Sequence, residues 1–191
     1  MKLEQTADGS YTLYVPELDE HYHSVKGALT ESQHIFIEMG LKHSPVSEPH
    51  ILEIGLGTGL NAFLTLLSAE ETRRKVHYTG IERYPLAEET LKQLDYPRLI
   101  GKQHEEDYYA IHQAPWDTET EVSPWFTLHK IEDDFTRLFN PVEGSRPAVP
   151  LYDIVYFDAF APEKQPEMWE QSLFDLSLIH ISEPTRHAQI S

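Results

Sequence analysis

Apolar positions along the chain recur first with the spacing of a strand and then with that of a helix. Residues 11–15 alternate polar and apolar side chains after a turn-forming Asp-Gly pair, which predicts a short strand or hairpin. Residues 30–33 read TESQ, the pattern of a capping box, and apolar side chains then follow at helical spacing up to Gly40. We therefore expect an amphipathic helix that is capped by Thr30 and ends at Gly40.

From residue 50 onward, apolar runs typical of strands alternate with helical patterns. Strands are expected at residues 51–54, 76–81, 126–131 and 154–157, and helices around residues 62–69 and 86–94. We expect residues 101–124 to hold one short helix and an insertion, and residues 143–150 to form a loop. This alternation predicts an α/β fold with a parallel sheet that is covered on both faces, preceded by the N-terminal strand and helix.

Length and composition narrow the class of protein. The 191 residues fit one domain, no apolar run is long enough to span a bilayer, and the polar N-terminus lacks a signal-peptide layout, so we expect a cytoplasmic protein. The absence of cysteine excludes disulfides, thiolate metal sites and a cysteine nucleophile. The formal net charge of -17 argues against a nucleic-acid partner, because phosphate contacts need clustered Lys and Arg.

The most informative motif leaves a predicted buried strand and opens a helix. Residues 53–61 read EIGLGTGLN, so Gly55, Gly57 and Gly59 let the backbone turn sharply and approach a ligand closely. The spacing differs from the G-x-G-x-x-G fingerprint of dinucleotide-binding proteins, and an acid, Glu53, precedes it. A carboxylate there would repel a pyrophosphate but suits the cationic amino-acid end of S-adenosyl-L-methionine.

Acidic residues end the other predicted strands. Glu82 follows the second strand, where a carboxylate can accept both ribose hydroxyls of an adenosine, although acids are common at strand ends. Asp133 follows the third strand and can accept from the adenine amino group, or it can cap a helix instead. Asp158 follows the fourth strand and should face the same crevice, which favours a substrate contact over a simple turn role before Pro162.

His21 and His23 alternate and could share one face of an extended segment. A third metal ligand is not evident near them, so we expect no metal site and interpret both as surface or packed histidines.

Several segments together resemble the MnmC-type tRNA methyltransferases. The segments are YHS at residues 22–24, GALTE at 27–31, HIFI at 34–37, EIGLGTGLN at 53–61 and FDAFAP at 157–162. The resemblance implies a Rossmann-like class I methyltransferase that uses S-adenosyl-L-methionine to methylate the 5-aminomethyl group of wobble (2-thio)uridine in tRNA. It also implies that the cofactor is held by Glu53, Gly55, Gly57, Gly59 and Glu82, and that Asp158 lies beside the substrate amine as the catalytic residue. We expect Asn61, at the end of the loop motif, and Asp133 to complete the cofactor site. Some relatives carry a flavin-dependent oxidase that makes this amine, and we expect that partner to be separate here.

The last residues depart from this pattern. Residues 176–186 read LSLIHISEPTR, which is similar to the conceptual translation of a transposon sequencing adapter. We therefore expect residues 1–175 to form a methyltransferase domain that stops after about four core strands, and residues 176–191 to be a non-native tail.

Two other functions fit the same residues. The fold also hosts methyl- and aminopropyltransferases that act on small amines, and the acidic charge suits a cationic substrate. The chain can also be an inactive fragment that retains only part of a cofactor site.

Overall fold

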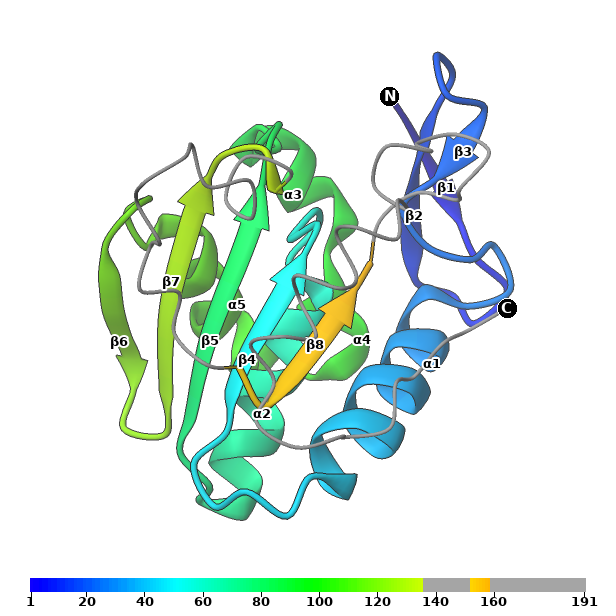
Figure 1. Ribbon diagram of the computed structural model, residues 1–191. Coiled ribbons are helices and arrows are strands. Elements are labelled where there is room, and N and C mark those ends of the chain that lie inside the picture. Colours follow the sequence, from blue (N-terminus) through cyan, green and yellow to red (C-terminus); the bar gives the residue numbers. More distant parts are fainter. Residues whose placement is uncertain (136–151, 159–191) are drawn as a thin grey trace.

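The computed structural model describes residues 1–135 and 152–158, which contain two separate sheets (Figure 1). The first is antiparallel, in the order β1-β2-β3, and comprises β1 (Lys2–Gln5), β2 (Tyr11–Val15) and β3 (Glu20–His21). The second has the order β6-β7-β5-β4-β8 and comprises β4 (His50–Ile54), β5 (Val76–Glu82), β6 (Glu119–Ser123), β7 (Phe126–Glu132) and β8 (Ile154–Phe157). The loop expected at residues 143–150 and the tail 176–191 lie outside the described residues.

Four strands of the second sheet are parallel, which confirms the α/β fold predicted from the sequence. Ile54 of β4 pairs with Ile81 of β5 on one side and with Phe157 of β8 on the other. The carboxyl ends of these three strands therefore lie at the same edge of the sheet, where open α/β sheets bind ligands. The antiparallel edge strand β6 was not predicted, because residues 101–124 were expected to hold only a short helix and an insertion.

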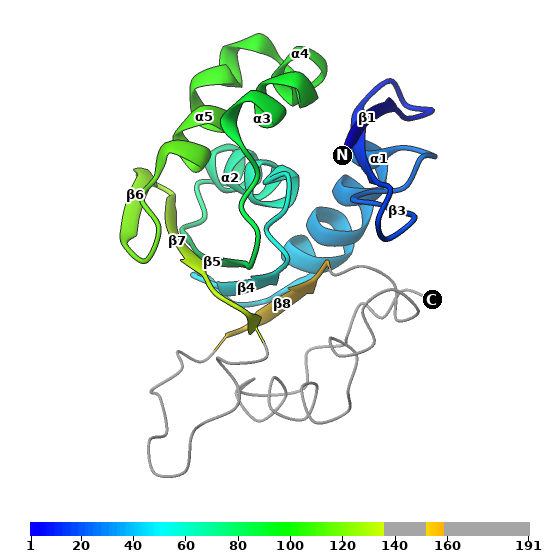
Figure 2. The same ribbon diagram turned by 90° about the horizontal axis from the view of Figure 1, so that it is seen from above.

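The described helices all lie on one face of the five-stranded sheet (Figure 2). They are α1 (Ala28–Ser32), which continues as the π-helix η1 (Gln33–Gly40) and the 3-10 turn η2 (Leu41–His43), then α2 (Leu60–Thr72), α3 (Glu88–Leu94), α4 (Tyr96–Ile100), the 3-10 turn η3 (Lys102–His104) and α5 (Glu105–Gln113). In these two parts of the chain, no helix is long and apolar enough to cross a membrane.

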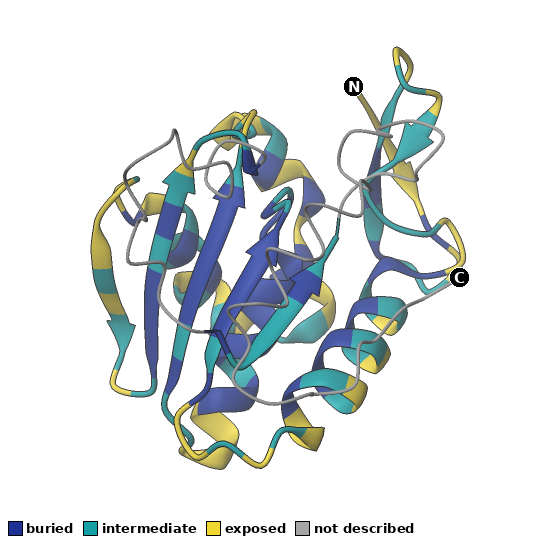
Figure 3. Ribbon diagram, in the orientation of Figure 1, coloured by how far each residue is buried: buried dark blue, intermediate teal, exposed yellow. Residues whose placement is uncertain are grey.

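The main core lies between this helical layer and the sheet (Figure 3). Helix α2 is buried along most of its length because it packs between the sheet and its neighbouring helices. The π-helix is tied to β8 by Tyr156, whose hydroxyl donates to the Phe36 carbonyl at 2.8 Å in the buried interior. This bond joins the N-terminal part of the chain to the strand that ends at Asp158.

The start of the first helix differs from the capping box that the sequence predicts. Helix α1 begins at Ala28, with Gly27 as its N-cap residue, so Thr30 lies inside the helix. Thr30 instead donates from both its backbone N–H and its hydroxyl to Oδ2 of Asp8, at 2.9 and 2.8 Å. Gly27 is needed here because a Cβ at this position would lie 2.7 Å from Oδ2 of Asp8.

Asp8 attaches the three-stranded sheet to helix α1. Its Oδ1 accepts hydrogen bonds from the hydroxyls of Thr6 and Ser10 and from the Ser10 N–H, at 2.6–3.0 Å. Burial acts to raise the pKa of Asp8, but the hydrogen bonds from Ser10, Thr6 and Thr30 outweigh it and hold this pKa well below its usual range. The ionised carboxylate is thus the form that the folded protein stabilises.

We predict that Asp8→Asn lowers the free energy of unfolding by about 1–3 kcal/mol at neutral pH, because the amide weakens hydrogen bonds that a charged acceptor strengthens. Since the folded pKa is depressed, the contribution of Asp8 is present above its unfolded pKa of about 3.9 and fades as the pH falls below that value. Urea unfolding at several pH values measures this dependence. Asp19→Asn, at an exposed carboxylate that accepts from Tyr14, is the control and should change stability by under about 0.5 kcal/mol. Equal losses in both variants would contradict the role of Asp8.

Candidate active site

The glycine-rich loop connects β4 to α2 at the carboxyl edge of the sheet, as the sequence predicts. Gly55, Gly57 and Gly59 have φ values of 88°, 51° and 71°, a region that side-chain-bearing residues rarely adopt. A Cβ on Gly57 would approach the ring of Tyr22 to 3.1 Å. The loop therefore requires glycine both for its backbone conformation and for close contact with the N-terminal segment.

Glu82 is the last residue of β5 and lies beside this loop. Its Oε2 accepts from the N–H of Gly57 at 2.9 Å, and its Oε1 accepts from the N–H of Tyr84 at 2.8 Å. The two backbone donors fix the direction of the carboxylate, while each oxygen retains capacity to accept a further hydrogen bond. The predicted neighbourhood of Glu82 and the glycine loop is confirmed.

Three predicted site residues meet at the adjacent strand ends. Asn61, in the first turn of α2, donates through Nδ2 to Oε1 of Glu53 at 2.9 Å and to Oδ2 of Asp158 at 2.8 Å. One amide group thus serves two carboxyl groups from neighbouring strands, β4 and β8. Oδ1 of Asn61 is buried and has no hydrogen-bond partner among the described residues.

The environment of this group favours the neutral carboxyl forms. Burial and then the charge of Asp158 raise the pKa of Glu53 well above its usual value. Burial raises the pKa of Asp158 to about 7, against the lowering effect of the Asn61 hydrogen bond, and Glu31 adds to the rise. No Lys or Arg in the described ranges pairs with either acid. A bound cation would supply the missing positive charge.

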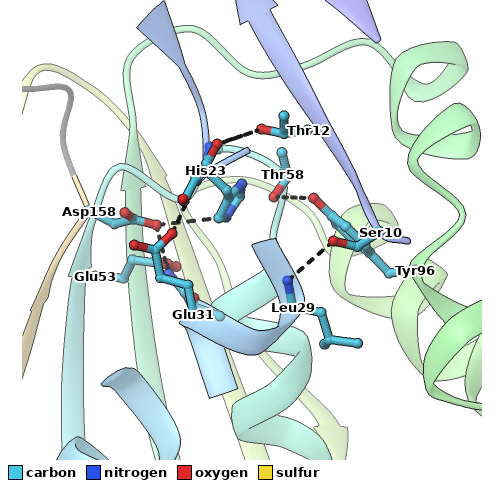
Figure 4. Close-up of polar contacts among 12 residues, drawn as sticks. Ser10, Thr12, His23, Leu29, Glu31, Glu53, Thr58, Tyr96 and Asp158 are labelled. Carbon is cyan, nitrogen blue, oxygen red and sulfur yellow. Dashed lines mark hydrogen bonds and ion pairs between the residues drawn. The ribbon is translucent and has the colours of Figure 1, made fainter. Parts of the chain in front are cut away.

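The N-terminal segment contributes residues that the sequence analysis gave no role. Tyr22 packs against Gly57, and burial followed by the charge of Glu82 raises the pKa of Tyr22 to about 12. His23 points toward Asp158, with Nε2 at 3.9 Å from Oδ2, and Glu31 lies on the same side (Figure 4). The YHS tripeptide belongs to the resemblance described above, but its role depends on contacts that local sequence does not reveal.

The two alternating histidines lie in different environments, one near the surface and one packed, which agrees with the sequence interpretation. His21 ends β3 and pairs with Glu4 at 2.9 Å, whereas His23 follows the strand and turns inward, leaving 6% of its side chain exposed. Within the two described parts of the chain, no group of three His, Asp or Glu side chains could hold a metal ion.

A hollow lies beside the glycine loop and Glu82. Its walls include Gly57, Glu82 and the apolar side chains of Pro85 and Leu86. Lys130 also lines it, with Nζ donating to the His112 carbonyl at 2.7 Å. Trp116 also lines the hollow, and its ring centroid lies 4.6 Å from Nζ of Lys130. Burial lowers the pKa of Lys130 to about 8, so its ammonium form still predominates at neutral pH.

Asp133 follows β7 but does not join either group of residues. Its Oδ1 accepts from the N–H of Asp134 at 2.7 Å, and Asp133 does not line the hollow beside Glu82. Asp134 instead forms an ion pair with Arg83 at 2.9 Å. The role of Asp133 toward adenine stays a prediction.

Comparison with known proteins gives matches over most of the chain. A family of S-adenosyl-L-methionine-dependent methyltransferases matches residues 135–188, a range that includes Asp158 and reaches into the segment interpreted as an adapter-like tail. The tRNA 5-methylaminomethyl-2-thiouridine biosynthesis bifunctional protein MnmC of Magnetococcus marinus is 31% identical over 172 residues, which cover 85% of this chain and 25% of the relative. The protein of the same name from Aeromonas hydrophila is 30% identical over 193 residues, which cover 92% of this chain and 28% of the relative.

A solved structure agrees with these sequence matches. The crystal structure of MNMC2 from Aquifex aeolicus superposes with a TM-score of 0.71 at 26% identity, covering 95% of this chain and 57% of that one. This chain thus spans about a quarter of the length of the curated relatives it matches. The central parallel sheet, the glycine loop and these matches lead to one conclusion: over most of its length the chain is similar to the MnmC-type S-adenosyl-L-methionine-dependent methyltransferases.

Proposed function

We propose that this chain transfers a methyl group from S-adenosyl-L-methionine to the primary amine of 5-aminomethyl-(2-thio)uridine at the wobble position of tRNA. The observation that carries this proposal is Asp158, a carboxyl group at a strand end beside the glycine loop, with a pKa of about 7 and no paired Lys or Arg among the described residues. Such a group is suited to take a proton from an ammonium substrate near neutral pH. The names of the relatives support the tRNA substrate.

The residues present fit the cofactor at both ends. Glu82 and the backbone of Gly57 border a hollow with apolar walls, which suits an adenosine whose ribose hydroxyls donate to the carboxylate. Glu53 and the unpartnered Oδ1 of Asn61 provide acceptors for an amino-acid ammonium group. When bound, S-adenosyl-L-methionine supplies an electrophilic methyl group on a positively charged sulfur.

The chain's own residues then have two tasks at the substrate amine. Asp158 accepts a proton from the ammonium form: an N–H bond breaks, an O–H bond forms, and the nitrogen lone pair becomes available. Asn61 holds the Asp158 carboxyl group in place, so the amine is oriented as well as deprotonated. Alignment of this kind can supply most of the rate of a displacement reaction.

The negative charge of the chain bears on how tRNA is bound. A net charge of -17 repels a phosphate backbone, whereas the carboxyl groups of the crevice attract the cationic aminomethyl group. We therefore propose that the modified base, rather than the backbone, makes the decisive contact with this chain. Consistent with the resemblance, a flavin-dependent oxidase would supply the amine.

The same charge favours a second candidate function, methyl or aminopropyl transfer to a small cationic amine. The two functions differ in salt dependence. Binding of tRNA weakens steeply with ionic strength when Lys and Arg contact phosphates, whereas binding of a small amine in a half-buried crevice changes less. Methylation of aminomethyl-modified tRNA, compared with free polyamines over a salt series, decides between them.

We predict that Glu82→Gln and Asp158→Asn have separable effects. Glu82→Gln should weaken cofactor binding about tenfold or more, because the ribose loses charge-assisted hydrogen bonds. Asp158→Asn should weaken cofactor binding only about threefold or less, through the loss of an ionisable group near the cation. It should lower single-turnover methylation by about a hundredfold or more, because the proton acceptor is lost. Calorimetry and rapid-quench methylation of modified tRNA measure the two effects.

Glu132→Gln is the control for this pair of variants, because Glu132 is the register partner of Glu82 on β7 and is exposed. It should bind cofactor and methylate like the parent chain. A variant Asp158→Asn that methylates at the parent rate while binding cofactor poorly would reverse the assigned roles.

We predict that Gly57→Ala weakens cofactor binding, whereas Gly9→Ala does not. Both positions have positive φ, 51° and 85°, so both variants should lose about 1–2 kcal/mol of stability. Only at Gly57 would the new Cβ crowd a neighbour, the Tyr22 ring, because Gly9 faces open space. Thermal unfolding and calorimetric titration with S-adenosyl-L-homocysteine measure both quantities. Unchanged affinity in a folded Gly57→Ala chain would argue against the loop as the cofactor site.

A further inference from the structure

The backbone of His23 is held by a buried hydroxyl group of the N-terminal sheet. The Thr12 hydroxyl donates to the His23 carbonyl at 3.2 Å and accepts from the His23 N–H at 3.0 Å. Thr12 is fully buried in β2, so this two-bond clamp is anchored in the three-stranded sheet. Figure 4 shows His23 between Thr12 on one side and Asp158 on the other.

The imidazole of His23 faces Asp158 but forms no hydrogen bond with it in the free protein. Nε2 lies 3.9 Å from Oδ2 of Asp158, about 1 Å beyond a hydrogen bond, and Nδ1 is buried without a partner among the described residues. The nearby carboxyl group favours the tautomer that carries its proton on Nε2. Catalytic hydrogen bonds are often long in the free enzyme and shorten when substrate binds.

We propose that His23 is a positioning residue for Asp158: it donates its Nε2–H to the Asp158 carboxylate whenever that group is ionised, as it is with the cationic amine bound, and so stabilises this carboxylate and aims it at the amine. This inference rests on the proposed function, because it gives the carboxylate an amine to face. His23 itself neither gains nor loses a proton. Its hydrogen bond complements that of Asn61, whose amide is shared with Glu53.

A neutral donor is what the surroundings of Asp158 require. The titratable groups that act on Asp158 or sense its charge are Glu31 from α1, Glu53 from β4, Tyr78 from β5 and Tyr96 from α4, and none of them carries positive charge. Burial lowers the pKa of His23 to about 4, so the imidazole is neutral near pH 7. It can therefore stabilise a carboxylate without repelling an ammonium substrate, which a lysine in this place would do.

The test measures the pKa of Asp158 directly, by NMR titration of its carboxyl carbon in the parent chain and in three variants. His23→Leu should raise this pKa by about one unit or more, because a hydrogen bond to a charged group is lost. His23→Gln keeps a neutral donor and should shift the pKa less than His23→Leu. His21→Leu, at the neighbouring exposed histidine, should leave the pKa unchanged. A folded His23→Leu chain with the parent pKa of Asp158 would overturn the proposal.

Thr12→Val keeps the test decisive if His23→Leu fails to fold, because it releases the backbone of His23 and leaves the imidazole intact. It should raise the pKa of Asp158 in the same direction, and an unchanged pKa in folded Thr12→Val and His23→Gln chains would also overturn the proposal. Methylation of modified tRNA by the same variants should fall most in His23→Leu at pH values near 7. If the parent chain methylates no amine, the proposed function fails, while the titration still decides whether His23 acts on Asp158.

Discussion

The amide group of Asn61, placed between the carboxyl groups of Glu53 and Asp158, is the interaction on which the rest of the site depends. Two acids on adjacent parallel strands repel each other when both are ionised, and burial increases the cost of each charge. A single NH2 group with two donors offsets part of this cost for both acids. The remaining imbalance makes the site receptive to a cation, which is the common property of the cofactor and of an amine substrate.

The fold brings these groups together from distant parts of the chain. Asn61 and Asp158 are 97 residues apart, and they meet because β8 pairs with β4, the strand that leads into the glycine loop. The N-terminal segment then covers the same edge: Tyr22 lies on the glycine loop and His23 faces Asp158. Asp8 holds the start of α1 through its hydrogen bond from Thr30, and Thr12 holds the backbone of His23. The small accessory sheet thus determines which side chains lie beside Asp158.

Local sequence predicted the features that depend on local physics. The loop at residues 53–61 needs positive φ and a strand-to-helix turn. The acids at 82 and 158 end short apolar runs that alternate with helical patterns, so their places at the strand ends follow from pattern and topology. The capping box failed because Gly27 and the carboxylate of Asp8 provide a different start for α1. Strand β6 was missed because it is a polar edge strand with no apolar alternation to mark it. His23 was missed because its burial depends on Thr12 and Asp158, which are distant in sequence.

Because Glu53 and Asp158 favour a bound cation, binding of the cofactor should be accompanied by a release of protons. With its pKa at about 7, Asp158 is partly protonated in the free protein near neutral pH, and the raised pKa of Glu53 shifts that group toward its protonated form as well. A bound cation lowers both pKa values, so S-adenosyl-L-methionine should release protons as it binds. Calorimetric titration at about pH 7, in buffers with different ionisation enthalpies, measures this release. The account predicts net proton release that diminishes in Asp158→Asn; binding without release, or with proton uptake, would contradict it.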